Sequence, residues 1–185
     1  MRRRPRTTSG LTLVEVALLL SLLGVVLAVG IPAFVRGLRT SKAAEAPDEL
    51  QRMFAAVSTY YETPQATPDG KRVHCVPEPA GPTPEKPSID PVEVKFTAPE
   101  TPGAATWRAL DYSPAGPVRY RYSLLPKRAG CGLAPTDART RILLTLRAEG
   151  DLDGDGVLSR FERSVTLRDG EIVLEPLLVV QERVE

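Results

Sequence analysis

The chain has 185 residues, of which 24 are basic, 23 are acidic and two are cysteine. This length suits one compact domain with a short additional segment. Because the two signs of charge nearly balance, the composition does not favour a nucleic-acid-binding protein, which would carry a strongly basic face.

A short basic leader, residues 1–10, precedes a long apolar segment. Four arginines before that segment place the N-terminus in the cytoplasm and the rest of the chain outside it, by the positive-inside rule. An ordinary secretory signal has its small-residue cleavage site after the apolar core, whereas Ser9-Gly10 lies before it. We therefore expect cleavage after Gly10, which would leave 20 basic and 23 acidic residues.

The apolar segment, residues 11–35, contains a single charged residue, Glu15. An ionised carboxylate near the hydrocarbon costs roughly 2.5–3.5 kcal/mol on insertion scales, so such residues are rare and usually functional. The 20 residues from Val16 to Val35 would form a helix of about 30 Å, the thickness of a bilayer core. We predict a membrane helix with a functional acid near its start.

Helical character continues through residues 36–62, where the apolar residues recur at spacings of three and four. This stripe predicts an amphipathic helix packed on a domain; it consists of Leu50, Met53, Phe54, Val57, Tyr60 and Tyr61. Pro32 and Pro47 are each expected to kink or break the helix. Pro47, followed by two acids, also resembles a helix start. We expect one long interrupted helix over about 11–62.

Residues 63–116 form a proline-rich connection, in which 63–105 alone hold ten of the 18 prolines. This composition predicts a long irregular connection, with a short strand over 92–96 as one option. From residue 117 to residue 185 the apolar residues follow period two, which predicts four strands, at 118–125, 139–149, 163–169 and 171–180. Asp169-Gly170 predicts a tight hairpin turn. The expected fold is α+β: a long N-terminal helix packed on an antiparallel sheet of about four strands.

Cys75 and Cys131 both lie in the part expected to be exported. In an oxidising compartment we expect them to form one structural disulfide. A metal or redox site is disfavoured, because no CxxC spacing occurs and the single histidine, His74, adjoins Cys75.

Residues 151–162, DLDGDGVLSRFE, have acids at positions 1, 3, 5 and 12 of a twelve-residue loop, with glycine at position 6. Calcium prefers six to eight hard oxygens, and this spacing directs alternate side chains at one centre. The expected ligands are Asp151, Asp153, Asp155, the Val157 carbonyl and Glu162. Because the flanking segments resemble strands, we expect a structural Ca²⁺ rather than a paired-helix sensor. A solvated acidic turn is the alternative.

Signatures of an enzyme are missing from the sequence: it has no GxSxG, no phosphate-binding glycine loop and no spaced cysteine–histidine pair. We therefore predict that the chain is not an enzyme. The aromatic residues Trp107, Tyr112, Tyr120 and Tyr122 are expected in the core or on a sheet face.

The leader and the spacing that follows it resemble the N-terminus of type IV pilins and the related pseudopilins, over residues 2–35. These features are Gly10 before the cut, Leu11 as first mature residue, Glu15 fifth after the cut, Gly24 fourteenth and Pro32 twenty-second. Two features differ from that family. Leu11 stands where many members have Phe or Met, and the two cysteines do not form a pair near the C-terminus.

The resemblance implies a structural filament subunit. In that family a prepilin peptidase cuts after the glycine and commonly N-methylates the new N-terminus, here Leu11. The subunit would cross the inner membrane once, with its C-terminal domain in the periplasm. An inner-membrane assembly platform would then extrude it into a pilus with other pilin subunits. Glu15 would pair with the Leu11 amine of a neighbouring copy, and Gly24 and Pro32 would let the helix loosen.

Three functions follow from these observations. The first is a pilin, and the calcium-type loop and the proline-rich connection favour a minor over a major one. The second is a pseudopilin of a type II secretion system. The third, from another class, is a single-span periplasmic calcium-binding protein that does not polymerise, which explains residues 151–162 but leaves Gly10 and Glu15 unexplained.

Overall fold

The computed structural model describes residues 12–132, 142–168, 171–176 and 179–181. The chain divides into two compact units, Met1–Thr40 and Ser41–Glu185, which we describe separately. The first unit is the apolar part of α1 (Leu13–Ala43). Within it, Leu13–Phe34 is long and apolar enough to cross a membrane, although a signal sequence would meet the same criterion.

The interruption of the N-terminal helix lies at Ala44, between α1 and α2 (Glu45–Glu62). A kink or a break was expected at Pro32, and the break is wrong, because α1 runs through that residue. Pro47 is the third residue of α2, in its first turn, where backbone N–H groups have no partner within the helix. The helix start expected near Pro47 is therefore confirmed.

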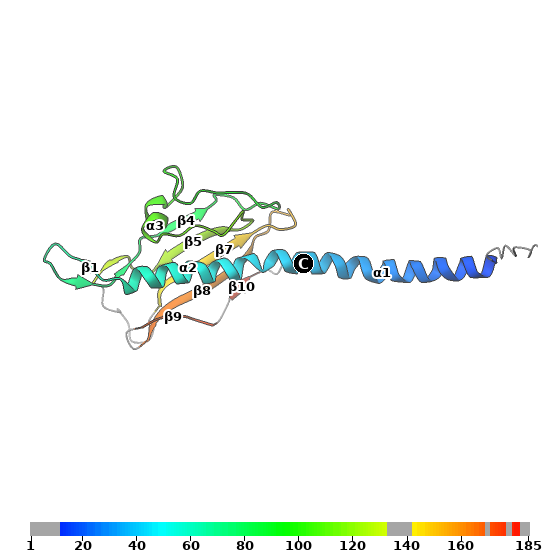
Figure 1. Cartoon of the computed structure of the whole chain (residues 1–185), viewed down its shortest axis with the longest axis horizontal. Coiled ribbons are helices and arrows are strands. Elements are labelled where there is room, and N and C mark those ends of the chain that lie inside the picture. The colour runs from blue at the N-terminus through cyan, green and yellow to red at the C-terminus, as the bar shows by residue number, and fades with distance from the viewer. Residues whose placement is uncertain (1–11, 133–141, 169–170, 177–178, 182–185) are drawn as a thin grey trace, which may run out of the picture. The chain divides into compact units, whose positions relative to one another are not determined.

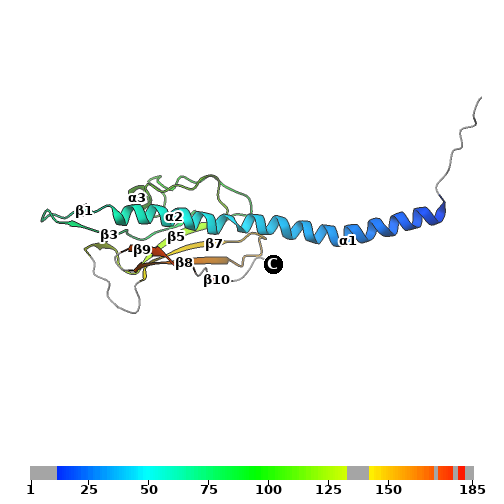
Figure 2. The same ribbon diagram turned by 60° about the horizontal axis from the view of Figure 1, so that its bottom comes forward.

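The second unit contains a six-stranded antiparallel sheet, with α2 lying along one face (Figures 1 and 2). The strand path is β10-β8-β7-β5-β4, and β9 also pairs with β8. The strands are β4 (Ala80–Thr83), β5 (Arg121–Pro126), β7 (Ile142–Gly150), β8 (Ser159–Arg168), β9 (Glu171–Leu174) and β10 (Val179–Gln181). The α+β class is confirmed. The predicted strand 171–180 is two strands, and the turn at Asp169-Gly170 falls outside the described residues.

The proline-rich connection is more regular than its composition predicts. It contains β1 (Gln65–Ala66), β2 (Arg72–Val73), β3 (Cys75–Val76), β4 and α3 (Ala104–Ala109). β1 pairs with β2, and β3 pairs with β6 (Gly130–Cys131). The strand considered at 92–96 is reduced to one bridge between Val92 and Val118.

The core lies between α2 and the sheet. Leu50, Met53 and Val57 of the predicted stripe are fully buried, as the amphipathic pattern requires. Their partners in the cluster include Leu124 and Leu146 of the sheet. Among the aromatic residues expected in the core, all are buried: Trp107, Tyr112, Tyr120 and Tyr122.

The other face of the sheet carries paired charges. Arg121, Glu149 and Arg160 are directly opposite one another on β5, β7 and β8. Both arginines bind the Glu149 carboxylate at 2.8 Å. Burial raises the pKa of Glu149, but the hydrogen bonds and charges of Arg160 and Arg121 outweigh it, so this pKa lies below its usual value.

Candidate functional site

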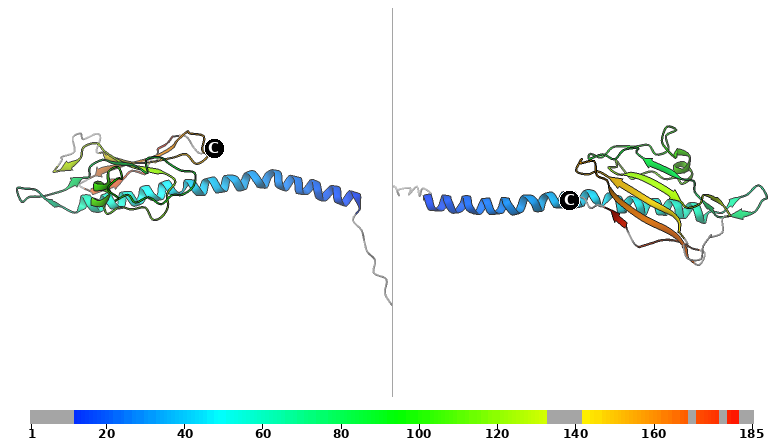
Figure 3. Two further views of the ribbon diagram at one scale, coloured as in Figure 1. Left: turned by 90° about the horizontal axis from the view of Figure 1, so that it is seen from above. Right: turned by 180° about the vertical axis from the view of Figure 1, so that it is seen from behind.

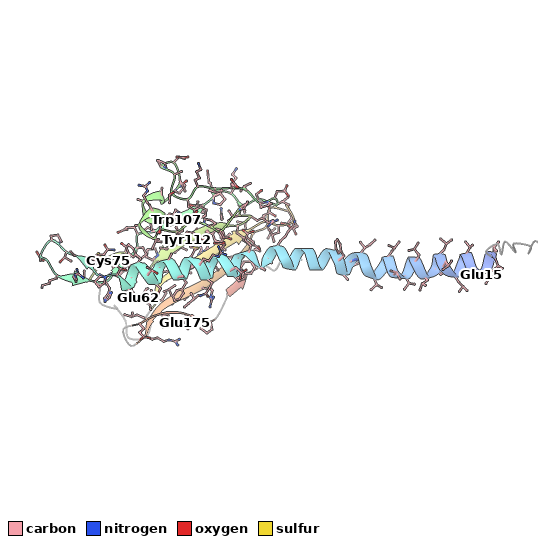
Figure 4. All side chains as sticks on the ribbon, viewed as in Figure 1. Glu15, Glu62, Cys75, Trp107, Tyr112 and Glu175 are labelled. Atoms are coloured by element: carbon pink, nitrogen blue, oxygen red, sulfur yellow. A yellow bond between two sulfur atoms is a disulfide. The ribbon has the colours of Figure 1, made fainter. Side chains whose placement is uncertain are left out.

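Glu15 closes a capping box at the start of α1, where Figure 4 labels it. The Thr12 backbone N–H and the Thr12 hydroxyl each donate to Glu15 Oε2 at 2.8 Å. In return, the Glu15 backbone N–H donates to Thr12 Oγ1 at 3.3 Å. These reciprocal bonds satisfy N–H groups that an unprotected helix end would leave without partners. Gly10 and Leu11, the expected cleavage site, lie outside the described residues.

The capping role of Glu15 was readable from the sequence, because Thr-x-x-Glu before an apolar run is a capping-box signature. It does not exclude a second role. A carboxylate offers about four acceptor sites, so the two bonds to Thr12 leave capacity for an amine.

Gly24 and Pro32 both lie within α1. A Cβ atom at Gly24 would meet nothing within 4 Å, so packing inside the chain does not require glycine there. Glycine costs about 1 kcal/mol relative to alanine inside a helix, and proline removes one backbone hydrogen bond. The two residues therefore weaken α1 at two points.

Three acids of the calcium-type loop converge where β7 ends and β8 begins. The carboxylates of Asp151, Asp153 and Asp155 each offer an oxygen, and these oxygens lie within 4.8 Å of one another. Asp151 also accepts bonds from the backbone N–H groups of Gly154 at 2.7 Å and Gly156 at 3.1 Å. Both glycines have positive φ, 80° and 86°, so the loop turns sharply where side chains would be strained.

Glu162, expected as the bidentate ligand, is not a member of this convergent group. It lies in β8 opposite Arg147 and binds the guanidinium Nε at 2.6 Å. The physical reason is the element that follows the loop. A helix would bring position 12 back to the ion, whereas β8 begins at Ser159 and carries Glu162 along the sheet. The Val157 N–H donates to Asp155 Oδ1 at 2.7 Å.

The donor set that the structure brings together therefore consists of three carboxylates. Hard oxygen ligands of this kind suit Ca²⁺ or Mg²⁺ rather than a soft metal. Because calcium prefers six to eight oxygens, main-chain carbonyls or water would have to complete its coordination. The residues fit a loosely held structural ion better than a closed, high-affinity cage.

The expected disulfide is present between Cys75 and Cys131. It joins β3 to β6 as directly opposite residues, and Figure 4 shows Cys75 near the C-terminal end of α2. His74, beside it, stacks on the Tyr61 ring at 5.1 Å and approaches the Tyr61 carbonyl at 2.7 Å. The disulfide therefore ties the proline-rich connection to the segment that follows β5.

Two acids of α2 that sequence reasoning missed hold the helix to the domain. Glu45 Oε1 accepts bonds from the Arg119 and Tyr120 backbone N–H groups, at 2.7 and 3.3 Å, and from the Tyr122 hydroxyl at 3.1 Å. Glu49 accepts the Tyr112 hydroxyl at 3.0 Å. Burial, then the nearby glutamates, raise the pKa of both tyrosines well above its usual value.

A sequence signal for this role was available in part. Glu45 and Glu49 are one helical turn apart and adjoin the buried residues Ala46 and Leu50. Acids beside an apolar stripe need buried hydrogen-bond donors. The sequence pattern does not identify which residues supply them.

No protein-family model, no curated protein and no solved structure matches this chain. Its function must therefore be argued from its own residues.

Proposed function

We propose that this chain is a subunit of a type IV pilus or a related filament, more like a minor than a major pilin. The observation that carries the proposal is the acid at the start of an exposed apolar helix, directly after a basic leader. Every side chain from Thr12 to Phe34 is exposed, so the helix needs lipid or other helices around it.

A membrane anchor alone does not account for Glu15. In a filament the apolar helices would form a bundle and exchange lipid for protein at little hydrophobic cost. Inside that bundle the carboxylate would be a costly buried charge unless a cation neutralised it. The free amine of Leu11 on a neighbouring copy is the partner that we propose, and this pair would fix the axial register of an incoming subunit.

The second unit supports the same assignment. A helix whose second half packs on an antiparallel sheet, with a disulfide over the connection, is the arrangement expected of a pilin-like subunit. Glu45 fastens α2 to β5 through Tyr122, and Glu49 fastens it to the connection before β5 through Tyr112. These bonds would hold α2 rigidly in the globular unit. Gly24 and Pro32 would make α1 easier to loosen.

The first prediction concerns the mature N-terminus. Mass spectrometry of protein purified from membranes should find a chain that begins at Leu11 and carries an N-methyl group. A Gly10→Val variant should keep its leader, because a bulky residue would block the peptidase, while a Ser9→Ala variant should be processed normally. A mature chain that still begins at Met1, or that begins after Phe34, would contradict the filament function.

The second prediction concerns a structural ion, which we propose binds at Asp151, Asp153 and Asp155. Ca²⁺ at a hundredfold excess over its Kd should stabilise the folded unit by about 2.7 kcal/mol. For a chain of this size that raises the unfolding midpoint by roughly 5–10 °C. Thermal unfolding of the full chain in detergent, with Ca²⁺ or with chelator, measures the effect.

The matched variants for this test are Asp153→Asn/Asp155→Asn, which should lose the calcium effect, and Asp69→Asn, an exposed acid of the β1–β2 hairpin, which should keep it. Equal midpoints with Ca²⁺ and with chelator for the unaltered protein would show that the loop is a solvated acidic turn.

The convergence of the three aspartates by itself favours a second candidate, a single-span calcium-binding protein that does not polymerise. The mature N-terminus separates the two, because that protein has no need to be cut after Gly10. A pseudopilin shares the processing, and is distinguished by dependence of its assembly on a secretion platform rather than a pilus platform.

A further inference from the structure

We propose that a surface at the end of the globular unit where α2 begins binds residues 36–42 of a second copy. This inference rests on the proposed filament function, because a filament presents the helix of one copy to the globular unit of another. The surface consists of exposed apolar and acidic residues, and we call it the acidic–apolar surface: Ile89, Asp90, Val92, Glu93 and Val157, beside the three loop aspartates.

Three exposed apolar side chains form its centre. Among the described residues outside α1, the exposed large hydrophobic side chains are Ile89, Val92 and Val157, at 45, 39 and 51% exposure. Such residues are ordinary when they are scattered. Here all three belong to two neighbouring segments, residues 88–93 and the loop between β7 and β8.

The contacts that bring these segments together are specific. A Cβ atom on Gly154 would lie 2.7 Å from Ile89 Cδ1, so the loop tip and residue 89 are packed against each other. Val92 is paired with Val118, and the Ser88 N–H donates to the Arg119 carbonyl at 2.9 Å. The surface is therefore held by backbone bonds and close packing.

Its position at the start of α2 follows from two further contacts. The Tyr120 ring packs on Gly150, the residue before the loop, since a Cβ atom there would meet the ring at 2.5 Å. The Tyr120 N–H donates to Glu45, the first residue of α2. Figures 1 and 3 show the connection between β7 and β8 at the end of the sheet where α2 begins.

The acidic–apolar surface is negative, and its five acids still outnumber the flanking lysines and the two charges of a Ca²⁺ bound at the loop. Asp90 and Glu93 are exposed, and the loop adds the three aspartates. Lys86 and Lys95 flank residues 89–93, which still leaves acids in excess. An anionic membrane surface would be repelled, so a basic partner with some apolar area is the complementary occupant.

Residues 36–42 of the chain, RGLRTSK, have that chemistry. Arg36, Arg39 and Lys42 recur every three residues along α1, Leu38 lies between them, and residues 36–44 contain no acid. The segment ends three residues before Glu45. In parallel copies with a small axial offset, the basic segment of one copy would therefore lie level with the acidic–apolar surface of the next.

The test uses the full chain in membranes with its assembly machinery. Two differently tagged copies are expressed together, one with Leu38→Cys and one with Val157→Cys. Oxidation should give a disulfide-linked dimer that carries both tags. Leu38→Cys with Ala66→Cys, an exposed position in the β1–β2 hairpin, is the matched control and should give none.

Charge reversal tests whether attraction between acidic and basic residues holds the two copies together. Asp90→Lys/Glu93→Lys should lower the yield of the Leu38–Val157 dimer by about tenfold, because like charges are then juxtaposed. Adding Arg36→Glu/Arg39→Glu on the other copy should restore it. Asp69→Lys, a single charge reversal far from the surface, should have no effect. Trypsin resistance and the Cys75–Cys131 disulfide report that each variant has folded.

A dimer yield that is unaffected by the reversal, or not restored by the second one, overturns the inference, and so does linkage of Val157→Cys to a different protein. Correct processing at Gly10 without the linked dimer rejects this contact alone. A chain that keeps its leader rejects the filament function itself.

Discussion

Replacement of Glu15 by leucine is expected to lower the amount of the chain found in filaments by roughly a hundredfold or more. Its insertion in the membrane should be kept or improved. The physical reason is the amine that the carboxylate would neutralise. Loss of one partner of a buried ion pair costs about 3–5 kcal/mol, because the other charge remains buried without compensation. The fraction of variant subunits in sheared filaments, measured beside unaltered subunits in the same cells, gives the effect.

The capping box provides the matched control for this prediction. Thr12→Val removes both contacts of the Thr12 hydroxyl with Glu15 but keeps the carboxylate. Loss of a helix cap costs about 0.5–2 kcal/mol, so this variant should still enter filaments. Glu15→Leu subunits present at the unaltered level would show that the acid only caps α1 and has no part in assembly.

The elements that the sequence predicted correctly are those with strong local periodicity. The stripe of Leu50, Met53 and Val57 found the buried face of α2, since residues three or four apart share one side of a helix. Period two located β5, β7 and β8. Pro32 did not end α1, which runs through it although proline removes one backbone hydrogen bond.

Elements that depend on distant pairing were not predictable. β4 contains Pro82 and is a strand because Ala80 and Thr83 lie opposite Leu124 and Tyr122, about 40 residues later in the chain. Proline is tolerated there because β4 is the edge of the sheet. Local composition alone therefore predicted an irregular connection.

The candidate sites divide in the same way. Asp151, Asp153 and Asp155 were found because close spacing in one loop brings carboxylates together. Glu162 was expected with them, but the strand after the loop directs it to Arg147. The bonds of Glu45 and Glu49 were missed because their donors lie more than 60 residues away.

Trp107→Ala is the substitution with the largest expected effect on stability. The side chain is fully buried and lies beside Tyr112, as Figure 4 shows. It packs on Phe96 and Tyr112 with ring centroids 5.3 and 5.4 Å apart, and its Nε1–H donates to Thr83 at 3.1 Å. Truncation of a buried tryptophan to alanine costs about 3–5 kcal/mol, a large part of the 5–15 kcal/mol that stabilises a typical domain.

The measurement is brief proteolysis of the full chain in detergent at increasing urea, where the unfolded globular unit is cleaved. Trp107→Phe separates packing from hydrogen bonding. It keeps most of the ring contacts, and the Thr83 hydroxyl still donates to the Pro102 carbonyl at 3.2 Å, so the loss should be about 1 kcal/mol. If Trp107→Ala unfolded at the same urea concentration as the unaltered protein, α3 and β4 would not belong to the cooperative core. The packing of α2 on the globular unit would then depend on Glu45, Glu49 and the apolar stripe alone.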